Sequence, residues 1–292
     1  MNPARSDKRQ PGFTLIELLV ALGIFLLITG AAFTLLSSSQ QRYQTESQVL
    51  TSFQEARLGL DQIVRDVNDA GYPPPSFNAG DPTLFAISPF AWSQGSGYPV
   101  NPCLIGTAGG GNCTTATLGD TAPGDFDLIV ETNPNPQDPS CAPNCLVQWI
   151  RYQLQGTTLM RGAALKNNGD PDTAFNGANI APFVQNVVNN SPNLQVGVDA
   201  GGNPITLFQQ YPAMFPGGAP VPIFQYTCDT PSLSQSLPPP TAPCPLAAAA
   251  DKTPANIRDV TITLIVKAPL PDATTGRARL VQLEGRGRRV NP

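Results

Sequence analysis

The chain has 292 residues, no histidine and a formal net charge of −4 at pH 7. The lack of histidine removes the most common general base, the Ser-His-Asp arrangement and imidazole metal sites. The acidic balance argues against broad nucleic-acid binding, because phosphate contacts require clustered Lys and Arg. We therefore expect no enzyme, no catalytic residue, no cofactor and, by default, no bound nucleic acid.

The first elements in chain order are a short basic leader and a long apolar run. The leader, residues 1–12, has three basic side chains and ends at Gly12. Residues 13–36 follow with a single charged side chain, Glu17. A helix rises about 1.5 Å per residue, so this run reaches roughly 36 Å, enough to cross a hydrocarbon core of about 30 Å. The run predicts a transmembrane helix, and the leader predicts a cytoplasmic N-terminus.

Two other interpretations of this segment fit less well. A secretory signal peptide has a shorter apolar region, followed by small residues before the cleavage site. Here the small residue, Gly12, precedes the apolar run instead. A plain membrane anchor leaves Glu17 unexplained, because an ionised carboxylate in the bilayer costs about 3 kcal/mol or more. Glu17 is therefore a candidate functional residue that needs a partner.

The junction between leader and apolar run reads GFTLIE over residues 12–17. Together with the basic leader, it resembles the class III signal of type IV prepilins and type II secretion pseudopilins. The resemblance implies cleavage between Gly12 and Phe13 by a prepilin peptidase on the cytoplasmic face, and N-methylation of the new Phe13 amine. It also implies that the apolar helix stays on the mature protein, first in the inner membrane and later in a filament core.

Cleavage would give Glu17 a partner, because it exposes an ammonium group at Phe13. The nearest carboxylate on a neighbouring subunit would be Glu17. A charge pair is stronger in a low dielectric than in water, although desolvation offsets much of the gain. We therefore expect Glu17 to set the register between assembling subunits rather than to stabilise the isolated chain.

Helical periodicity continues beyond the apolar run. After a polar stretch, apolar residues recur in alternating steps of three and four from Leu50 to Val67, which is the spacing of one helix face. Gly71 and three following prolines end the pattern,. We predict one helix with an apolar half, residues 13–36, and an amphipathic half, residues 37–71.

The remaining residues, 72–292, have the composition of a loop-rich β domain, here called the head. The chain contains 32 Pro and 26 Gly, well above average usage. Residues 155–158 suggest a hairpin turn, and residues 229–250 suggest an exposed loop. The predicted strands are 126–131, 146–154, 159–161, 194–198, 223–227, 260–266 and 279–283. The predicted fold class is α+β and pilin-like: a long N-terminal α-helix packed on an antiparallel β-sheet head with long loops.

A second resemblance extends over most of the head. Its segments are QEAR at 54–57, Gly71-Tyr72, RYQL at 151–154, LMR at 159–161 and IRDV at 257–260. They are similar to PilW-type minor pilins and J-type minor pseudopilins. The resemblance implies a minor subunit that helps initiate or cap a type IV pilus, with its head in the periplasm before assembly. The open alternatives are a type II secretion pseudopilin, a tip adhesin or DNA-capture subunit, and a bulk shaft pilin.

All six cysteines follow the helix, on the translocated side, where disulfides persist. They are Cys103, Cys113, Cys141, Cys145, Cys228 and Cys244. Fifteen connectivities are possible. Sequence proximity favours three disulfides: Cys103–Cys113, Cys141–Cys145 and Cys228–Cys244,. A zinc site is the competing interpretation, but histidine and a Cys-x-x-Cys pair are both absent,.

Other charged clusters are expected to be structural or solvated. Asp170 and Asp172 lack the full ligand spacing of a calcium loop, which favours a solvated turn and no metal site. Asp120 and Asp125 are treated in the same way, and Asp127 is expected at a turn or strand edge. The C-terminal arginines are expected on a solvated edge strand and a frayed terminus. They are Arg277, Arg279, Arg286, Arg288 and Arg289.

Overall fold

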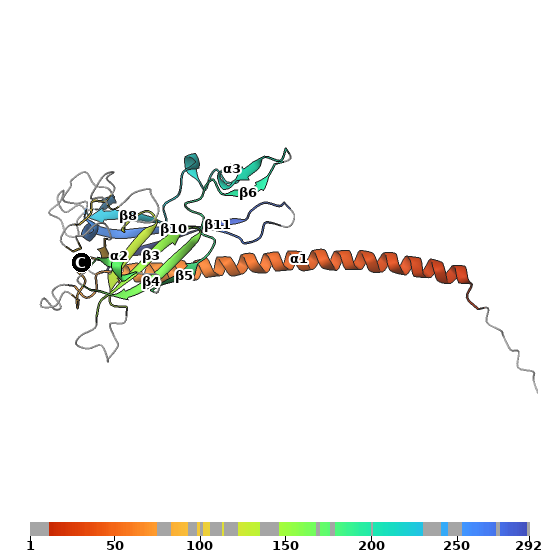
Figure 1. The fold of residues 1–292 in the computed structure, drawn as a ribbon, viewed down its shortest axis with the longest axis horizontal. Helices are drawn as coiled ribbons and strands as arrows, with labels where there is room; N and C mark the ends of the chain where they lie inside the picture. Colours follow the sequence, from red (N-terminus) through yellow and green to blue (C-terminus); the bar gives the residue numbers. More distant parts are fainter. Residues whose placement is uncertain are drawn as a thin grey trace, which may run out of the picture. The chain divides into compact units, whose positions relative to one another are not determined.

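The chain contains one long helix and a β-rich head, shown in a computed structural model (Figure 1). It divides into two compact units, Met1–Ser47 and Gln48–Pro292. Helix α1, Leu15–Asn68, begins in the first unit and ends in the second. The structure describes residues 12–74, 83–92, 98–99, 102–105, 113, 122–134, 146–167, 170–175, 179–199, 201–229, 241–244, 253–272 and 275–290.

In the first unit, α1 presents apolar side chains all round. Every large apolar side chain from Phe13 to Leu36 is more than half exposed. The hydroxyls of Thr29 and Thr34 donate to helix carbonyls one turn earlier, at 2.7 and 2.6 Å, so they need no water. The helix is long and apolar enough to cross a membrane, and it lies near the N-terminus. These properties fit a membrane anchor.

The helix ends three residues earlier than predicted. Asp69 and Ala70 form a tightened last turn, in which the Ala70 amide donates to the Val67 carbonyl at 3.2 Å. Gly71 then takes a φ of 83°, the left-handed conformation that glycine adopts without strain. Its amide donates to the Glu131 carbonyl at 2.9 Å. The chain therefore leaves the helix because its backbone bonds to a strand of the head.

The head contains two larger antiparallel sheets and one hairpin. The first sheet has the order β1 (Phe90–Ala91), β2 (Asp127–Thr132), β3 (Gln148–Gln155), β4 (Thr158–Leu165), β5 (Ile180–Val184). The second has the order β11 (Leu280–Arg288), β10 (Ile257–Lys267), β8 (Phe224–Asp229), β9 (Thr241–Pro243). Strands β6 (Gln195–Val198) and β7 (Pro204–Thr206) pair with each other. The α+β prediction is confirmed.

Each predicted strand coincides with an observed one, and the predicted hairpin joins β3 to β4. Gly156 begins its two-residue loop with a φ of 60°, as type II′ turns require. Four strands were not predicted: β1, β5, β7 and β9. All four lie at a sheet edge, and three of them contain proline, which sequence patterns count against a strand although edges tolerate it. Strand β9 also corrects the prediction that 229–250 is one loop; residues 230–240 and 245–250 lie outside the described residues.

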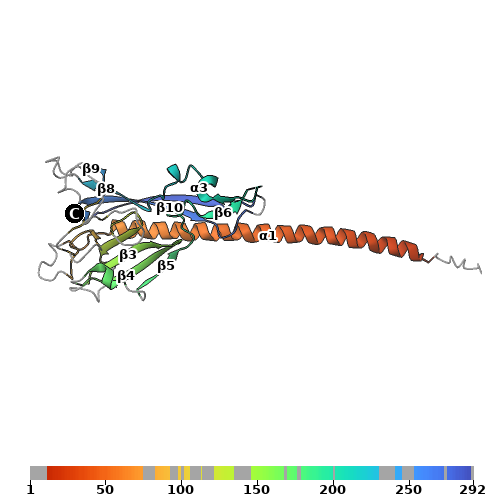
Figure 2. The same cartoon turned by 45° about the horizontal axis from the view of Figure 1, so that its top comes forward.

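The second half of α1 packs against both larger sheets (Figure 2). Four residues of the predicted stripe are buried: Ala56, Leu60, Ile63 and Val67. Leu50 was predicted on the same face, but it is 59% exposed.

Glycines set how closely the strands approach the helix. A Cβ on Gly59 would lie 2.4 Å from Val184 of β5, and one on Gly287 of β11 would lie 2.5 Å from Val67. Real Cβ atoms do not approach this closely. Glycine is therefore required at position 59, where α1 meets β5 of the first sheet, and at position 287, where β11 of the second sheet meets α1.

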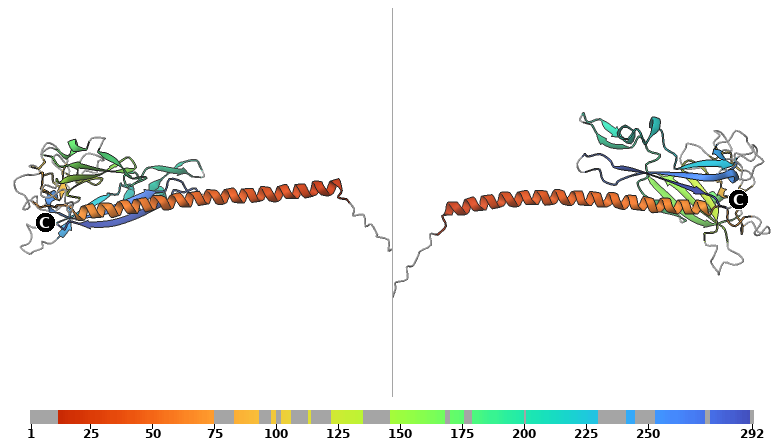
Figure 3. Two further views of the ribbon diagram at one scale, coloured as in Figure 1. Left: turned by 90° about the horizontal axis from the view of Figure 1, so that it is seen from below. Right: turned by 180° about the vertical axis from the view of Figure 1, so that it is seen from behind.

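A smaller lobe, residues 188–221, adds a second apolar cluster beside β10 and β11 (Figure 3). The lobe contains α3 (Leu207–Gln210) and the β6–β7 hairpin. Its buried Leu207 and Phe215 share this cluster with Ile265 of β10. The fully buried Asn189 amide donates to the carbonyls of Val221 and Thr263, at 3.2 and 2.8 Å. The lobe is therefore fixed to the second sheet by both apolar and polar contacts.

Replacing Gly287 with valine tests the close approach of β11 to α1. We expect the free energy of unfolding of the head to fall by about 1–3 kcal/mol, the usual cost of overpacking a core. Urea unfolding, followed by the fluorescence of the buried Trp92 and Trp149, measures the change. Gly197→Ala is the control, because a Cβ there meets nothing within 4 Å. Equal stability of Gly287→Val and wild type would contradict the predicted contact.

Candidate functional site

The predicted cleavage site lies before the first turn of α1. Gly12, Phe13 and Thr14 have no regular secondary structure, and helix α1 begins at Leu15. Phe13 is 90% exposed, and nothing lies within 4 Å of the position of a Cβ on Gly12. A peptidase needs an extended, accessible backbone, and this junction supplies one. Cleavage and methylation at this bond remain predictions.

Glu17 forms a capping box with Thr14 at the start of α1. The Thr14 amide and hydroxyl both donate to Glu17 Oε2, each at 2.9 Å. In return, the Glu17 amide donates to the Thr14 hydroxyl at 3.3 Å. This reciprocal arrangement satisfies amides that the first helical turn otherwise leaves without partners. Glu17 therefore has a role within its own chain in addition to the predicted role between subunits.

The sequence contains a signal for this cap that our prediction missed. Thr14-Leu15-Ile16-Glu17 matches the Ser/Thr-x-x-Glu pattern that precedes an apolar helix,. The cap uses Glu17 Oε2, and Glu17 Oε1 has no partner among the residues that the structure describes. The carboxylate can therefore keep its own helix capped while its other oxygen accepts an outside donor.

A shallow apolar hollow of about 330 Å³ adjoins this carboxylate on the helix surface. Its lining residues are Ile16, Glu17, Val20, Ala21 and Ile24. Ala21 provides the small side chain that allows a neighbouring helix to approach. The geometry therefore places one acid at the edge of an apolar surface suited to helix packing.

In the head, a buried polar network connects α1 to the first sheet. The Tyr152 hydroxyl of β3 donates to Asp66 Oδ2 of α1 at 2.5 Å. Arg161 of β4 donates to the same oxygen at 2.9 Å and to the Tyr152 hydroxyl at 2.9 Å. Gln62 donates to the other Asp66 oxygen at 2.8 Å. Removing one partner would leave a buried charge or donor unsatisfied, so this network fixes how the helix meets the sheet.

Asp127 is inside the head, which corrects its expected place at a turn or edge. It lies on β2 with a side chain that is 2% exposed, and Arg151 of β3 pairs with it at 2.5 Å. Arg151 also pairs with Asp172 at 2.6 Å. Asp170 caps α2 (Pro171–Ala174) by accepting from the Asp172 amide at 2.9 Å. The expected solvated turn is therefore a capped helical turn held by Arg151.

Burial raises the pKa of Asp125. Its carbonyl accepts from the amides of Ile223 and Phe224, so its backbone joins the first sheet region to β8. Asp120 lies outside the described residues. No group of three or more His, Cys, Asp or Glu that could hold a metal ion occurs in the part of the chain that the structure describes.

A second buried charge pair was not predicted. Glu131 of β2 and Lys166 pair at 2.5 Å, with side chains that are 0% and 1% exposed. Burial lowers the pKa of Lys166, and the Glu131 charge opposes this effect. Glu131 Oε2 also accepts from the Tyr98 hydroxyl at 2.6 Å and from the amides of Ile87 and Ser88. Because the carboxylate is fully hydrogen-bonded, we interpret this cluster as structural.

Of the C-terminal arginines, Arg286 and Arg288 lie on the edge strand β11, as predicted, but the described residues that follow the strand are not frayed. Strand β11 continues to Arg288, and the Arg289 side chain is only 13% exposed, paired with Asp229 at 3.1 Å. Arg286 and Asp259 pair at 2.8 Å across β11 and β10. Arg279 pairs with Asp272. Arg288 also lies 3.7 Å from Asp259. Four of the five arginines therefore serve the fold, and the exposed Arg277 stands apart.

The structure joins Cys103 to Cys113 and Cys228 to Cys244. These are two of the three pairs that sequence proximity favours. Cys141 and Cys145 lie outside the described residues, so their pairing stays a prediction. Among the described residues, no cysteine is free.

Comparison with known families identifies the N-terminal segment. Residues 7–33 match the prokaryotic N-terminal methylation motif. The motif supports the type IV pilin and pseudopilin family, whose members are structural subunits rather than enzymes. No curated protein and no solved structure matches the chain significantly. The match stops at residue 33, so it does not distinguish among the kinds of pilin.

Alkaline titration tests the buried tyrosine networks. Burial raises the pKa of Tyr98, Tyr152 and Tyr226, and the charges of Glu131, Asp66 and Asp125 respectively raise it further. A pKa raised on folding contributes stability that is complete below the unfolded value of about 10 and is lost as pH rises through the folded value. We expect these three side chains to ionise only as the head unfolds, with tyrosinate absorbance and circular dichroism changing together. The Tyr152→Phe variant should have one fewer tyrosine that ionises only on unfolding. Ionisation of all tyrosines near pH 10 in a folded head would contradict the networks.

Proposed function

We propose that this chain is a minor pilin that helps initiate or cap the assembly of a type IV pilus. The observation that carries the proposal is the N-terminal methylation motif on a helix whose apolar half, residues 13–36, has a single charge, Glu17, beside an exposed apolar surface. In a helix that stayed alone in lipid, Glu17 would still cap the first turn, but its charge would remain costly without a cation,. An acid beside a packing surface instead serves the docking of a second helix.

Maturation completes the proposed docking site. Prepilin peptidase would cut between Gly12 and Phe13, and the new Phe13 amine would be methylated, which keeps its positive charge. Before assembly, the chain would cross the inner membrane once, with the leader in the cytoplasm and the head in the periplasm. In the filament, the Phe13 amine of one subunit would meet Glu17 of its neighbour. Other pilin subunits are therefore the expected partners.

The head favours a minor subunit over a bulk shaft subunit. It combines two larger sheets with the additional 188–221 lobe, and such a volume is difficult to accommodate at every step of a crowded shaft. The segments similar to PilW-type minor pilins also include Arg151, Tyr152 and Arg161, which hold the head together. A minor pseudopilin of a type II secretion system remains the alternative, because the same N-terminal motif serves both assemblies.

Glu17→Gln tests the docking role in the native host. The amide can still accept the Thr14 bonds that cap α1, but it lacks the charge that attracts an ammonium group,. We expect normal amounts of the variant in the inner membrane and at least a tenfold decrease in its recovery from sheared filaments. Glu55→Gln, an exposed acid-to-amide change in the second half of α1, is the control. Normal incorporation of Glu17→Gln would refute the docking role.

A deletion strain separates the candidate functions. Loss of surface filaments supports the minor pilin, whereas loss of protein secretion with intact pili would assign the chain to a pseudopilus. Intact filaments with loss of surface attachment or DNA uptake would indicate a tip adhesin or DNA-capture subunit. High abundance along sheared filaments would indicate a shaft pilin.

A further inference from the structure

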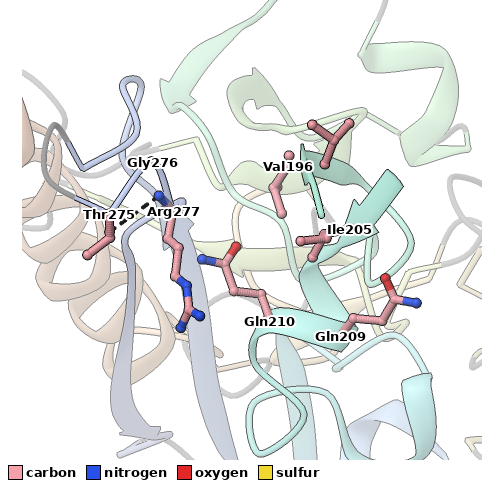
Figure 4. A pocket seen from close by; sticks show the side chains of 9 residues that line it. Val196, Ile205, Gln209, Gln210, Thr275, Gly276 and Arg277 are labelled. Atoms are coloured by element: carbon pink, nitrogen blue, oxygen red, sulfur yellow. Dashed lines mark hydrogen bonds between the residues drawn. The ribbon is translucent and has the colours of Figure 1, made fainter. Parts of the chain in front are cut away.

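A hollow of about 600 Å³ lies on the head between the 188–221 lobe and the turn before β11 (Figure 4). The lobe contributes the β6–β7 hairpin and α3, and the turn contributes residues 275–277. This volume is within the range of small-ligand sites. None of its lining residues belongs to the buried polar networks described above.

Both walls of the hollow are held in place by hydrogen bonds within the head. On the lobe side, Thr206 and Gln209 form a capping box that fixes α3, and the Tyr211 hydroxyl donates to the Ala278 carbonyl. On the turn side, Asp272 accepts from the amide and hydroxyl of Thr275, at 2.8 and 3.1 Å. The site is therefore largely pre-formed, which reduces the entropy lost when a ligand binds.

Two side chains of the hollow, Gln210 and Arg277, carry hydrogen-bond donors without a partner among the described residues. Gln210 Nε2 has no partner among the described residues, and because solvent does not reach it in this conformation, the amide must turn toward the hollow to meet a ligand. Arg277 is exposed, and its guanidinium has no ion pair within the described part of the chain. In Figure 4, both side chains extend into the space between α3 and the turn. The lining residues include no Asp or Glu, so the hollow favours an anion.

Apolar side chains form the opposite wall of the hollow. They are Val196, Val198 and Ile205. A ligand that fills the site must therefore present an anionic group at one end and a short aliphatic surface at the other. A guanidinium is suited to a carboxylate, because Arg binds both of its oxygens through two parallel hydrogen bonds, and the Gln210 amide can add another. A phosphate monoester would bring more negative charge than a single arginine balances.

We propose that this hollow binds a carboxylate attached to a short aliphatic body. Arg277 and Gln210 would donate to the carboxylate oxygens, and Val196, Val198 and Ile205 would contact the aliphatic part. Free aliphatic acids and the C-termini of peptides ending in an aliphatic residue share this chemistry. The site does not depend on the docking role of Glu17, and its ligand is recognised by the head alone.

Calorimetric titration of the full mature chain in detergent micelles tests the proposal. The probes are butyrate, N-acetyl-valyl-valine, the C-terminal amide of this dipeptide, and inorganic phosphate. We expect saturable binding of the dipeptide acid and at least tenfold weaker binding of its amide and of phosphate, because the amide lacks the carboxylate charge and phosphate lacks the aliphatic part. Binding of the dipeptide at least tenfold tighter than butyrate would identify peptide C-termini as the ligand source, and equal binding would identify small acids.

Two variants assign the binding to the hollow. Arg277→Gln, at an exposed turn position, should weaken binding of the dipeptide acid at least tenfold. Gln210→Leu should also weaken this binding, while circular dichroism shows an unchanged fold. Arg57→Gln on α1 changes the net charge equally at another exposed position and should have no effect. Absence of saturable binding to the acids, equal affinity for acid and amide, or unchanged binding by Arg277→Gln would overturn the proposal. These measurements do not involve filaments, so they are independent of the Glu17→Gln outcome.

Discussion

A single carboxylate near the start of an apolar helix constrains how this molecule can be used. Glu17 is the only charge in residues 13–36, and its Oε2 atom already caps its own helix through Thr14. In a bilayer the remaining charge is costly unless a cation approaches it. Cleavage after Gly12 would produce such a cation at Phe13 on every mature subunit. The same short segment could therefore cap a helix and hold the chain in a membrane. After cleavage it could also provide the acid and the amine that pair between neighbouring subunits.

The head depends on a comparable constraint, applied to the second half of α1. One face of the helix contacts β5 and β11, the edge strands of two different sheets, and glycines at positions 59 and 287 permit the close approach. Asp66 selects one orientation of the helix, because only that orientation brings its carboxylate to Tyr152 and Arg161. Apolar burial supplies most of the stability in such an arrangement, and the polar network restricts it to one geometry. The helix is thus an integral part of the head core as well as an anchor.

Local patterns in the sequence were sufficient for the helix, the fold class and the longer strands. They failed for β1, β5, β7 and β9, because short edge strands, three of them with proline, are defined by their partners rather than by their own residues,. They also failed for Asp127 and the pair Glu131–Lys166, since a charged residue in a strand is buried only when a distant partner reaches it,. The capping box was readable at Thr14 and Glu17, and the hollow was not, because Gln210 and Arg277 meet only through the tertiary fold.

The intact mass and N-terminal residue of the protein isolated from its native membranes test the central claim most directly. The account predicts a chain that begins at Phe13, carries one added methyl group and retains the whole apolar helix. Material that begins at Met1, or that has lost residues 13–36, would contradict it, because Glu17 would then have either no new amine to meet or no place in the mature subunit.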